Sequence, residues 1–439
     1  MGKPQNVVNL PTRKPDSAYT TKQWAQLHKD LFGTVEVGDK TYEPGDALKR
    51  VKEFADHNTL APVAVLALAI MRVCASVPVG TTFNAGIGPG SLNQLNAIVG
   101  RPGSGKDRHS YRVSLALSVY RGNHKVEPQE LPLTATGEGV VEALKDGHPA
   151  IFGTSEVGGL HELMKRQGST LRATMLSAYS GNAIGFTNKK DPSSIAANGY
   201  VLGMWVSIQP DKAGALLEGE DDGLAHRFLW FEPINPTLID DPITSDADSQ
   251  VTELHPVYIP EGIEETGVKF HESIVQETVL AGRETLTYGP RGNNNGHRHQ
   301  TRLKVAAGLA LLASRKEVDL GDWHRAGALM DYSDAVRRNC QRHLENKEVD
   351  AVVKRSLRHE AAADQIHKER YEKAERLIRG TLTERESVKR SDLRDKARRF
   401  RQQFDEVLYD LSQNRAVTLS KNGVLTPGPN FRPLQEQVS

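Results

Sequence analysis

The sequence predicts an α/β protein built around a parallel β-sheet, and two observations support this prediction. Between Asn96 and Pro233, short apolar segments alternate with stretches of helical periodicity, an order that produces parallel strands joined by helices. The segment "LNAIVGRPGSGKDRHSYRV" (Leu95–Val113) then places a glycine-rich turn between an apolar segment and an amphipathic helical pattern. Such a turn presents backbone N–H groups and a helix N-terminus to an anion, so we expect phosphate to bind there.

Length, charge and cysteine usage set the bounds of the prediction. A chain of 439 residues is long enough for two or three domains with a sizeable core. The formal net charge is +1, so any nucleic-acid surface has to be local. Cys74 and Cys340 are far apart in the sequence and have no partners at metal-binding spacing. This pattern argues against a disulfide framework and predicts a protein of the reducing cytoplasm. The most apolar stretch, Ala61–Val77, meets Arg72 after about eleven residues and is too short to span a bilayer. It predicts a buried helix and no membrane partner.

The glycine-rich turn carries the residues of a phosphate-binding loop with one departure. Its glycines allow close approach of the backbone to phosphates, and Lys106 adds a full positive charge for the β- and γ-phosphates. The next residue in such loops is Ser or Thr, whose hydroxyl binds Mg²⁺, but here it is Asp107. The predicted ATP-binding residues are Gly100, Gly103, Ser104, Gly105, Lys106 and Asp107.

A second apolar segment, "HPAIFGTSEVGGL", carries the candidate acid for hydrolysis. Glu156 stands where a general base would act, but the preceding position, usually Asp, is Ser155. The two departures are reciprocal, because Asp107 replaces a hydroxyl and Ser155 replaces a carboxylate. If both side chains lie beside the Mg²⁺ of bound ATP, one acid and one hydroxyl are preserved there. The alternative is that both positions have decayed independently in a nucleotide-binding relic.

The region from His161 to Pro233 follows, with the segments "YSGNAIGFTNKKDPSS", "SIQPD" and "LAHRFLWFEP" in this order. It resembles the helicase module of phages, plasmids and integrated elements, often encoded beside primase-polymerases, and more distantly the minichromosome maintenance branch of AAA+ ATPases. The similarity extends from roughly Ala61 to Tyr332. It implies an ATP- and Mg²⁺-dependent DNA helicase that works as a ring oligomer, expected to be a hexamer, with single-stranded DNA in its channel. It also implies a primase-polymerase as a candidate partner.

The resemblance assigns roles to individual residues. Gln209 corresponds to the polar sensor of the γ-phosphate, and Arg227 corresponds to an arginine finger that acts on the nucleotide of a neighbouring subunit. In "GHRHQTRLKVAAGLALLA", either Arg298 or Arg302 corresponds to the second sensor of a helical lid, and we select Arg302.

A glycine-flanked segment before Gln209 predicts a hairpin with a basic end. Gly181 is followed by the short run "AIGFTN", which contains Gly185, and then by Lys189 and Lys190. Such a hairpin would contact the phosphate backbone of DNA in the channel. The alternative is an ordinary solvated surface turn.

The C-terminal segment predicts a winged helix. It contains two helical patterns, of which the second has Phe404, Val407, Leu408 and Leu411 on one face, and then two extended segments joined at Asn422-Gly423. The basic residues of this segment are candidates for DNA contacts. They are Lys389, Arg390, Arg394, Lys396, Arg398, Arg399 and Arg401.

These assignments divide the chain into six segments. They are an N-terminal tail and helical region (1–60), a P-loop AAA+ core (61–235), a linker (236–262), a helical lid (263–350), a connecting helix (351–380) and a winged-helix domain (381–439). The leading functional hypothesis is a DNA helicase or translocase for replication of a phage or mobile element. One alternative is a nucleotide-gated DNA-binding initiator or loader with weak or no hydrolysis. The other is a scaffold whose loop no longer holds nucleotide.

Overall fold

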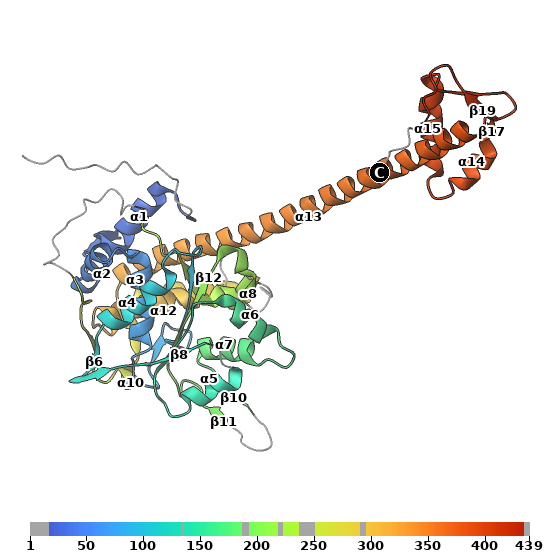
Figure 1. The fold of residues 1–439 in the computed structure, drawn as a ribbon. Helices are drawn as coiled ribbons and strands as arrows, with labels where there is room; N and C mark the ends of the chain where they lie inside the picture. Colours follow the sequence, from blue (N-terminus) through green and yellow to red (C-terminus); the bar gives the residue numbers. More distant parts are fainter. Residues whose placement is uncertain are drawn as a thin grey trace, which may run out of the picture. The chain divides into compact units, whose positions relative to one another are not determined.

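The computed structural model divides into two compact units, Met1–Glu345 and Asn346–Ser439 (Figure 1). It describes residues 17–133, 136–186, 193–217, 223–236, 251–289 and 296–433. Within the described residues, no helix is both long enough and apolar enough to cross a lipid bilayer.

The first unit is built on a sheet of five parallel strands, which confirms the predicted α/β class. The strands are β5 (Gln94–Val99), β8 (Gln129–Pro132), β9 (Ala150–Thr154), β12 (Leu202–Ile208) and β13 (Phe228–Phe231). Their spatial order is β13-β5-β12-β9-β8, or 5-1-4-3-2 when they are counted along the chain. Every residue of β5 is buried, as expected for a parallel strand covered on both faces. All five strands therefore end at the same edge of the sheet.

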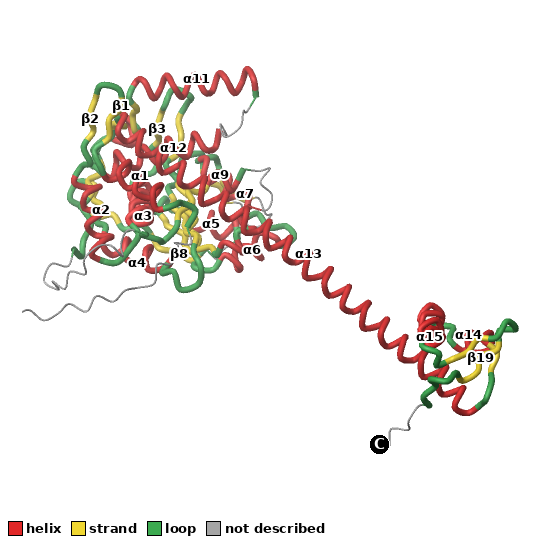
Figure 2. The backbone as a smooth tube through the Cα atoms, turned by 90° about the horizontal axis from the view of Figure 1, so that it is seen from above, coloured by secondary structure: helices red, strands yellow, loops and turns green. Residues whose placement is uncertain are grey.

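Helices cover both sides of this sheet, with α3 and α4 on one side and α6 and α7 on the other in Figure 1. Figure 2 shows the same unit from above, with the helices around the strands. The helices of the unit before α13 are α1 (Thr21–Phe32), α2 (Asp46–His57), α3 (Pro62–Cys74), α4 (Lys106–Ala116), α5 (Gly137–Leu144), α6 (Val157–Lys165), α7 (Leu171–Ser180), the 3₁₀ turn η1 (Pro210–Lys212), α8 (Gly214–Leu217), α9 (Leu224–Arg227), α10 (Ile263–Thr266), α11 (Glu272–Tyr288) and α12 (Gly296–Leu312).

Helix α3 is the buried helix that the sequence predicts. It packs against β5, β12 and β13 of the sheet and against α2, α4 and α12. The segment before it does not form a separate region, because Trp24 of α1 and Phe54 of α2 are fully buried in the same core.

Among its described residues, the first unit also contains four small sheets. They are β1 (Val35–Val37) with β2 (Lys40–Tyr42); β10 (Ile184–Phe186) with β11 (Ser193–Ile195); β14 (Val257–Ile259), β6 (Val119–Arg121) and β7 (His124–Val126) in this order; and β16 (Glu317–Val318), β15 (Val268–Phe270), β3 (Thr82–Asn84) and β4 (Pro89–Ser91) in this order. The antiparallel pair β10–β11 confirms the predicted hairpin strands. The predicted linker 236–262 needs correction at β14, because Val257 and Ile259 alternate with Tyr258 and bury one face of a strand.

The second unit has its own core and the predicted order of helices and strands. Its elements after α13 are β17 (Val388–Lys389), α14 (Arg390–Lys396), α15 (Arg401–Gln413), β18 (Val417–Leu419) and β19 (Val424–Pro427). The strands form an antiparallel sheet in the order β17-β19-β18. The four apolar residues predicted on one face of α15 are all buried in this core. Gly423, in the turn between β18 and β19, has φ +73°.

One long helix corrects two predicted boundaries. Helix α13 (Leu320–Glu384, 65 residues) runs through the borders expected at 350 and 380. No glycine or proline occurs between Gly327 and Gly380, so the sequence contains no residue that would end the helix near 350. At the second border the helix continues through Gly380 itself to Glu384. The expected lid and connecting helix are therefore joined without interruption.

Gly308 of α12 and Gly282 of α11 provide a matched test of how closely α12 packs against α3. A Cβ at Gly308 of α12 would lie 2.4 Å from Cγ2 of Ile70 and 3.0 Å from Sγ of Cys74, whereas a Cβ at Gly282 of α11 would meet only Ile87, at 3.8 Å. We expect Gly308→Ala to lower the thermal midpoint, because overpacking costs about 1–3 kcal/mol. Gly282→Ala should raise it, because Ala is favoured over Gly in a helix by about 1 kcal/mol. Equal effects in thermal unfolding would contradict the close α3–α12 contact.

Candidate nucleotide-binding site

The glycine-rich loop, residues 100–105, lies at the carboxyl edge of the central sheet between β5 and α4. Gly103 (φ +80°) and Gly105 (φ +75°) adopt left-handed backbone conformations that favour glycine. A Cβ at either position would meet nothing within 4 Å, so both glycines border open space. Gly100 is required for another reason, because its Cβ would lie 2.4 Å from Oγ of Ser104.

Lys106, the first residue of α4, folds back over the loop. Its Nζ donates hydrogen bonds to the carbonyl oxygens of Gly100 (3.0 Å) and Arg101 (3.2 Å). Burial lowers the pKa of Lys106. The ammonium group therefore lies at the loop with only neutral acceptors, and phosphate oxygens would be stronger partners for it.

His109 ties the end of the loop to the start of α3. The N–H of Ala61 donates to Nε2 of His109 (2.9 Å), so the ring proton must be on Nδ1, which lies 2.9 Å from the carbonyl oxygen of Gly105. Burial lowers the pKa of this imidazole. The neutral form is thus the one that fixes the loop.

The hydroxyl partner of Asp107 in the described chain is Ser207, which the sequence analysis missed. Oγ of Ser207 donates to Oδ1 of Asp107 at 2.9 Å. Ser207 lies on β12, the strand between β5 and β9, whereas Ser155 follows β9 and is exposed. With strands about 4.8 Å apart, the end of β9 is about 10 Å from the end of β5. The sequence did contain a signal for this contact, because Ser207 is a polar residue near the end of the apolar run "LGMWVSI".

The two other predicted residues of this edge lie just after their strands, Gln209 one residue after β12 and Glu156 two residues after β9. Glu156 is the N-cap residue of α6 and has an exposed side chain. Gln209 precedes η1 and lies beside the loop, because the N–H of Gly100 donates to the carbonyl oxygen of Ile208 at 2.9 Å. The carboxyl edge therefore brings together the loop, Asp107, Glu156 and Gln209.

Arg227 lies at the opposite edge of the sheet. It directly precedes β13, whose first residue, Phe228, pairs with Leu95 near the start of β5. The loop begins after Val99, about 13 Å further along that strand. The guanidinium carbon of Arg227 is 5.9 Å from the ring centroid of Tyr179. Arg227 is therefore remote from the loop of its own chain.

Both candidates for the second sensor pack against α13. Arg298 forms ion pairs with Asp331 and Asp334, each at 2.6 Å. Arg302 lies over the ring of Trp323, 3.6 Å from its centroid, and donates to the carbonyl oxygen of that residue at 3.0 Å. Burial lowers the pKa of Arg302. These contacts give both arginines a packing role within the chain.

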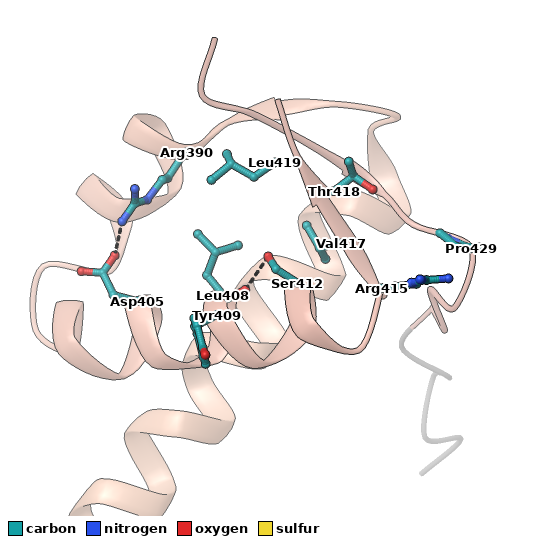
Figure 3. A pocket seen from close by; sticks show the side chains of 10 residues that line it. All are labelled: Arg390, Asp405, Leu408, Tyr409, Ser412, Arg415, Val417, Thr418, Leu419 and Pro429. Atoms are coloured by element: carbon teal, nitrogen blue, oxygen red, sulfur yellow. Dashed lines mark hydrogen bonds and ion pairs between the residues drawn. The ribbon is translucent and has the colours of Figure 1, made fainter. Parts of the chain in front are cut away.

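The candidate DNA-contacting residues differ in their surroundings. Arg390 and Arg394 both pair with Asp405, at 2.9 and 3.0 Å. Arg390 and Asp405 border a groove of about 600 Å³ between α14, α15 and β18 (Figure 3). Lys389 and Arg398 are exposed. Lys189 and Lys190 of the predicted hairpin end lie outside the described residues.

Comparison with known proteins finds no family model that matches the chain and no curated protein similar to it. In the described part of the chain, no three His, Cys, Asp or Glu side chains gather so that they could hold a metal ion. A Mg²⁺ ion at Asp107 would thus need oxygen ligands from a nucleotide and water, which is how this ion commonly binds.

The role of His109 can be tested by pH. Its pKa in the folded protein is below the ordinary value of about 6.5, so the stability it contributes is present above that pH and is lost as pH falls toward the folded-state pKa. At pH 7.5, His109→Phe should lower the free energy of unfolding by about 1–3 kcal/mol. The difference from the parent should shrink between pH 7 and 5, measured by denaturant unfolding. A difference that is constant with pH would contradict the neutral tautomer.

Proposed function

We propose that the protein is an ATP-dependent DNA translocase or helicase that serves replication of a phage or mobile element and works as a ring oligomer, expected to be a hexamer. The observation that carries the proposal is the glycine-rich loop with Lys106 at the carboxyl edge of a parallel sheet, beside Gln209 and Glu156. Ligands of open α/β sheets bind at this edge. The proposal includes a P-loop AAA+ core and a C-terminal winged helix.

The residues of the loop fit a nucleotide triphosphate. Open space borders Gly103 and Gly105, and Oγ of Ser104 is buried without a hydrogen-bond partner among the described residues. The N-terminus of α4 adds its partial positive charge. Lys106 would exchange its two carbonyl acceptors for phosphate oxygens, and the loop N–H groups would surround the β-phosphate. Asp107 would hold the Mg²⁺ ion with Ser155 as a second candidate ligand.

Bound ATP would supply the phosphoryl group for transfer to water. Glu156 would accept a proton from that water; its exposed side chain, two residues after the end of β9, supports this role. Gln209 directly follows the central strand β12 and lies beside the loop, and it would orient the water or the γ-phosphate. Both residues would act by positioning and by charge, which are the main contributions to phosphoryl transfer.

The position of Arg227 supports action between subunits. Within one chain it is separated from the loop by the length of β5, so it cannot stabilise charge on its own nucleotide. A head-to-tail contact places the amino edge of one subunit against the carboxyl edge of the next, and such contacts close into rings. The two edges of the sheet are thus complementary halves of one site.

A nucleotide-gated DNA-binding initiator or loader is the second candidate. It is favoured by the hydrogen bond between Asp107 and Ser207 and by the hydroxyl at position 155. Together they leave one carboxylate near the metal position, which suffices to bind nucleotide but weakens hydrolysis.

Mixing two inactive variants tests the action between subunits. Arg227→Ala should bind ATP normally but lose hydrolysis about 1,000-fold, since the finger acts only in the transition state. Lys106→Ala should lose binding. An equal mixture should recover up to roughly a quarter of the parental rate in a ring, because each intact loop can meet an intact finger of a neighbour. Steady-state ATPase assays measure this. A mixture as inactive as its components would refute the assignment of Arg227.

Exchanging the acid and the hydroxyl tests the metal site. Asp107→Ser leaves no acid beside Mg²⁺, and Ser155→Asp places two acids there, so each single variant should lose Mg²⁺-dependent hydrolysis. The double variant restores one acid and one hydroxyl and should recover activity, a non-additivity typical of residues at one site. Ser207→Ala is the control that keeps all acids and should lose less. If the parent does not exceed Lys106→Ala, both positions have decayed and the helicase proposal fails; binding of a labelled ATP analogue then separates the initiator from a scaffold that no longer holds nucleotide.

A further inference from the structure

The small sheet β14-β6-β7 presents a row of three side chains to solvent. Tyr258 of β14 pairs in register with Tyr120 of β6, and Tyr120 pairs with Lys125 of β7. In a sheet, residues in register project from the same face. The neighbouring row points to the core, since Val257 and Val119 are 0% and 1% exposed. The face that carries Tyr258, Tyr120 and Lys125, the tyrosine row, is therefore the outer one.

The two rings of the tyrosine row are stacked. Their centroids are 5.3 Å apart and their planes differ by 19°. Tyr258 is 52% exposed although it lies on a strand. Because β14 is an edge strand of this sheet, the stack ends at the sheet's edge with a ring that a further planar group can extend. Offset stacking of such groups is favourable beyond the area it buries.

The charge of the tyrosine row comes from Lys125. Its Nζ lies 3.1 Å from Oε1 of Glu127, and the side chains are 48% and 71% exposed. An exposed ion pair of this kind contributes little to stability, so the ammonium group can exchange the carboxylate for another anion. The nearby Arg121 is engaged elsewhere, because it donates to the carbonyl oxygens of Ser76 and Val77.

We propose that the tyrosine row is a binding site for single-stranded nucleic acid. A base would stack on Tyr258 and continue the pair of rings, and the adjoining phosphate would pair with Lys125. Flat aromatic faces beside a cation are the combination that holds single strands without sequence preference. A protein partner is less favoured, because the three residues of the tyrosine row are two phenol rings and an ammonium group, with no aliphatic side chain among them. The site is distinct from the nucleotide loop and shares with the proposed function only its ligand, DNA.

The first experiment measures binding of a fluorescent oligothymidylate to the full chain without nucleotide. We expect Tyr258→Ala to weaken binding about 5- to 150-fold, the range for loss of one stacked base. Tyr258→Phe should bind like the parent, and Tyr258→Val should bind weakly while it keeps strand propensity. Tyr111→Ala is the matched control, because Tyr111 is also exposed (64%) but lies on α4. It should have no effect.

The second experiment uses the ion pair, because its two members should act in opposite directions. Lys125→Gln should weaken binding and reduce the slope of log affinity against log salt by about 0.7, the value for one phosphate contact on a single strand. Glu127→Gln frees the ammonium group and should strengthen binding.

Unchanged affinity in Tyr258→Ala and Lys125→Gln would overturn the proposal, as would a parent that does not bind the oligonucleotide. A change of oligomeric state without a change in affinity would assign the tyrosine row to contacts between copies instead. The ATPase of the parent without DNA tests the proposed function alone, and Tyr258→Ala should keep that rate. Failure of the proposed function would therefore appear as an inactive parent, and failure of the tyrosine row as unchanged oligonucleotide binding.

Discussion

The first unit depends on one fully buried lysine. Nζ of Lys304, on α12, donates to the carbonyl oxygen of Asn93 at 2.7 Å and to that of Tyr179, and lies 3.6 Å from the centroid of the Tyr179 ring. Burial lowers the pKa of this amine well below its usual value, and these acceptors offset the cost of removing it from water. Asn93 precedes β5 and Tyr179 is near the end of α7, so one side chain fixes the origin of the loop-bearing strand and the base of the β10–β11 hairpin.

The same cluster orients the amino edge of the sheet. Arg227 faces the Tyr179 ring that Lys304 also contacts, and Tyr179 bonds through its hydroxyl to Thr301 of α12 at 2.6 Å. A displacement of α12 would therefore change the positions of Arg227 and of the hairpin together. In the proposed ring, these contacts would couple the position of Arg227 at a neighbour's nucleotide directly to the position of the hairpin proposed to contact DNA.

Local patterns predicted the fold well, and long-range contacts account for what they missed. The loop, α3 and the order of elements in the second unit follow from periodicity and glycine placement within short windows. The bond between Asp107 and Ser207 joins residues 100 positions apart and arises because β12 is inserted between β5 and β9. Lys304 lies in an apolar helical pattern, where a lysine is expected to reach solvent, and only the carbonyl groups of Asn93 and Tyr179 explain its burial. The linker was misjudged at β14 because a three-residue strand is stable only when it pairs with β6.

Electrostatics within the second unit bear on whether it can contact DNA. Helix α15 carries Asp405, Glu406 and Asp410, which by themselves would repel phosphates. Each of them is engaged inside the unit: Asp405 with Arg390 and Arg394, Glu406 with His367 at 3.2 Å, and Asp410 with the hydroxyl of Tyr371 at 2.5 Å. Burial acts to raise the pKa of Asp405, but the two arginines outweigh it and lower that pKa. Asp405 is thus compensated by two arginines, whereas Asp410 gains only a hydrogen bond from a neutral phenol; Lys389 and Arg398 are exposed. A chain with a net charge of +1 can still have locally positive surfaces where an acid such as Asp405 is held between arginines.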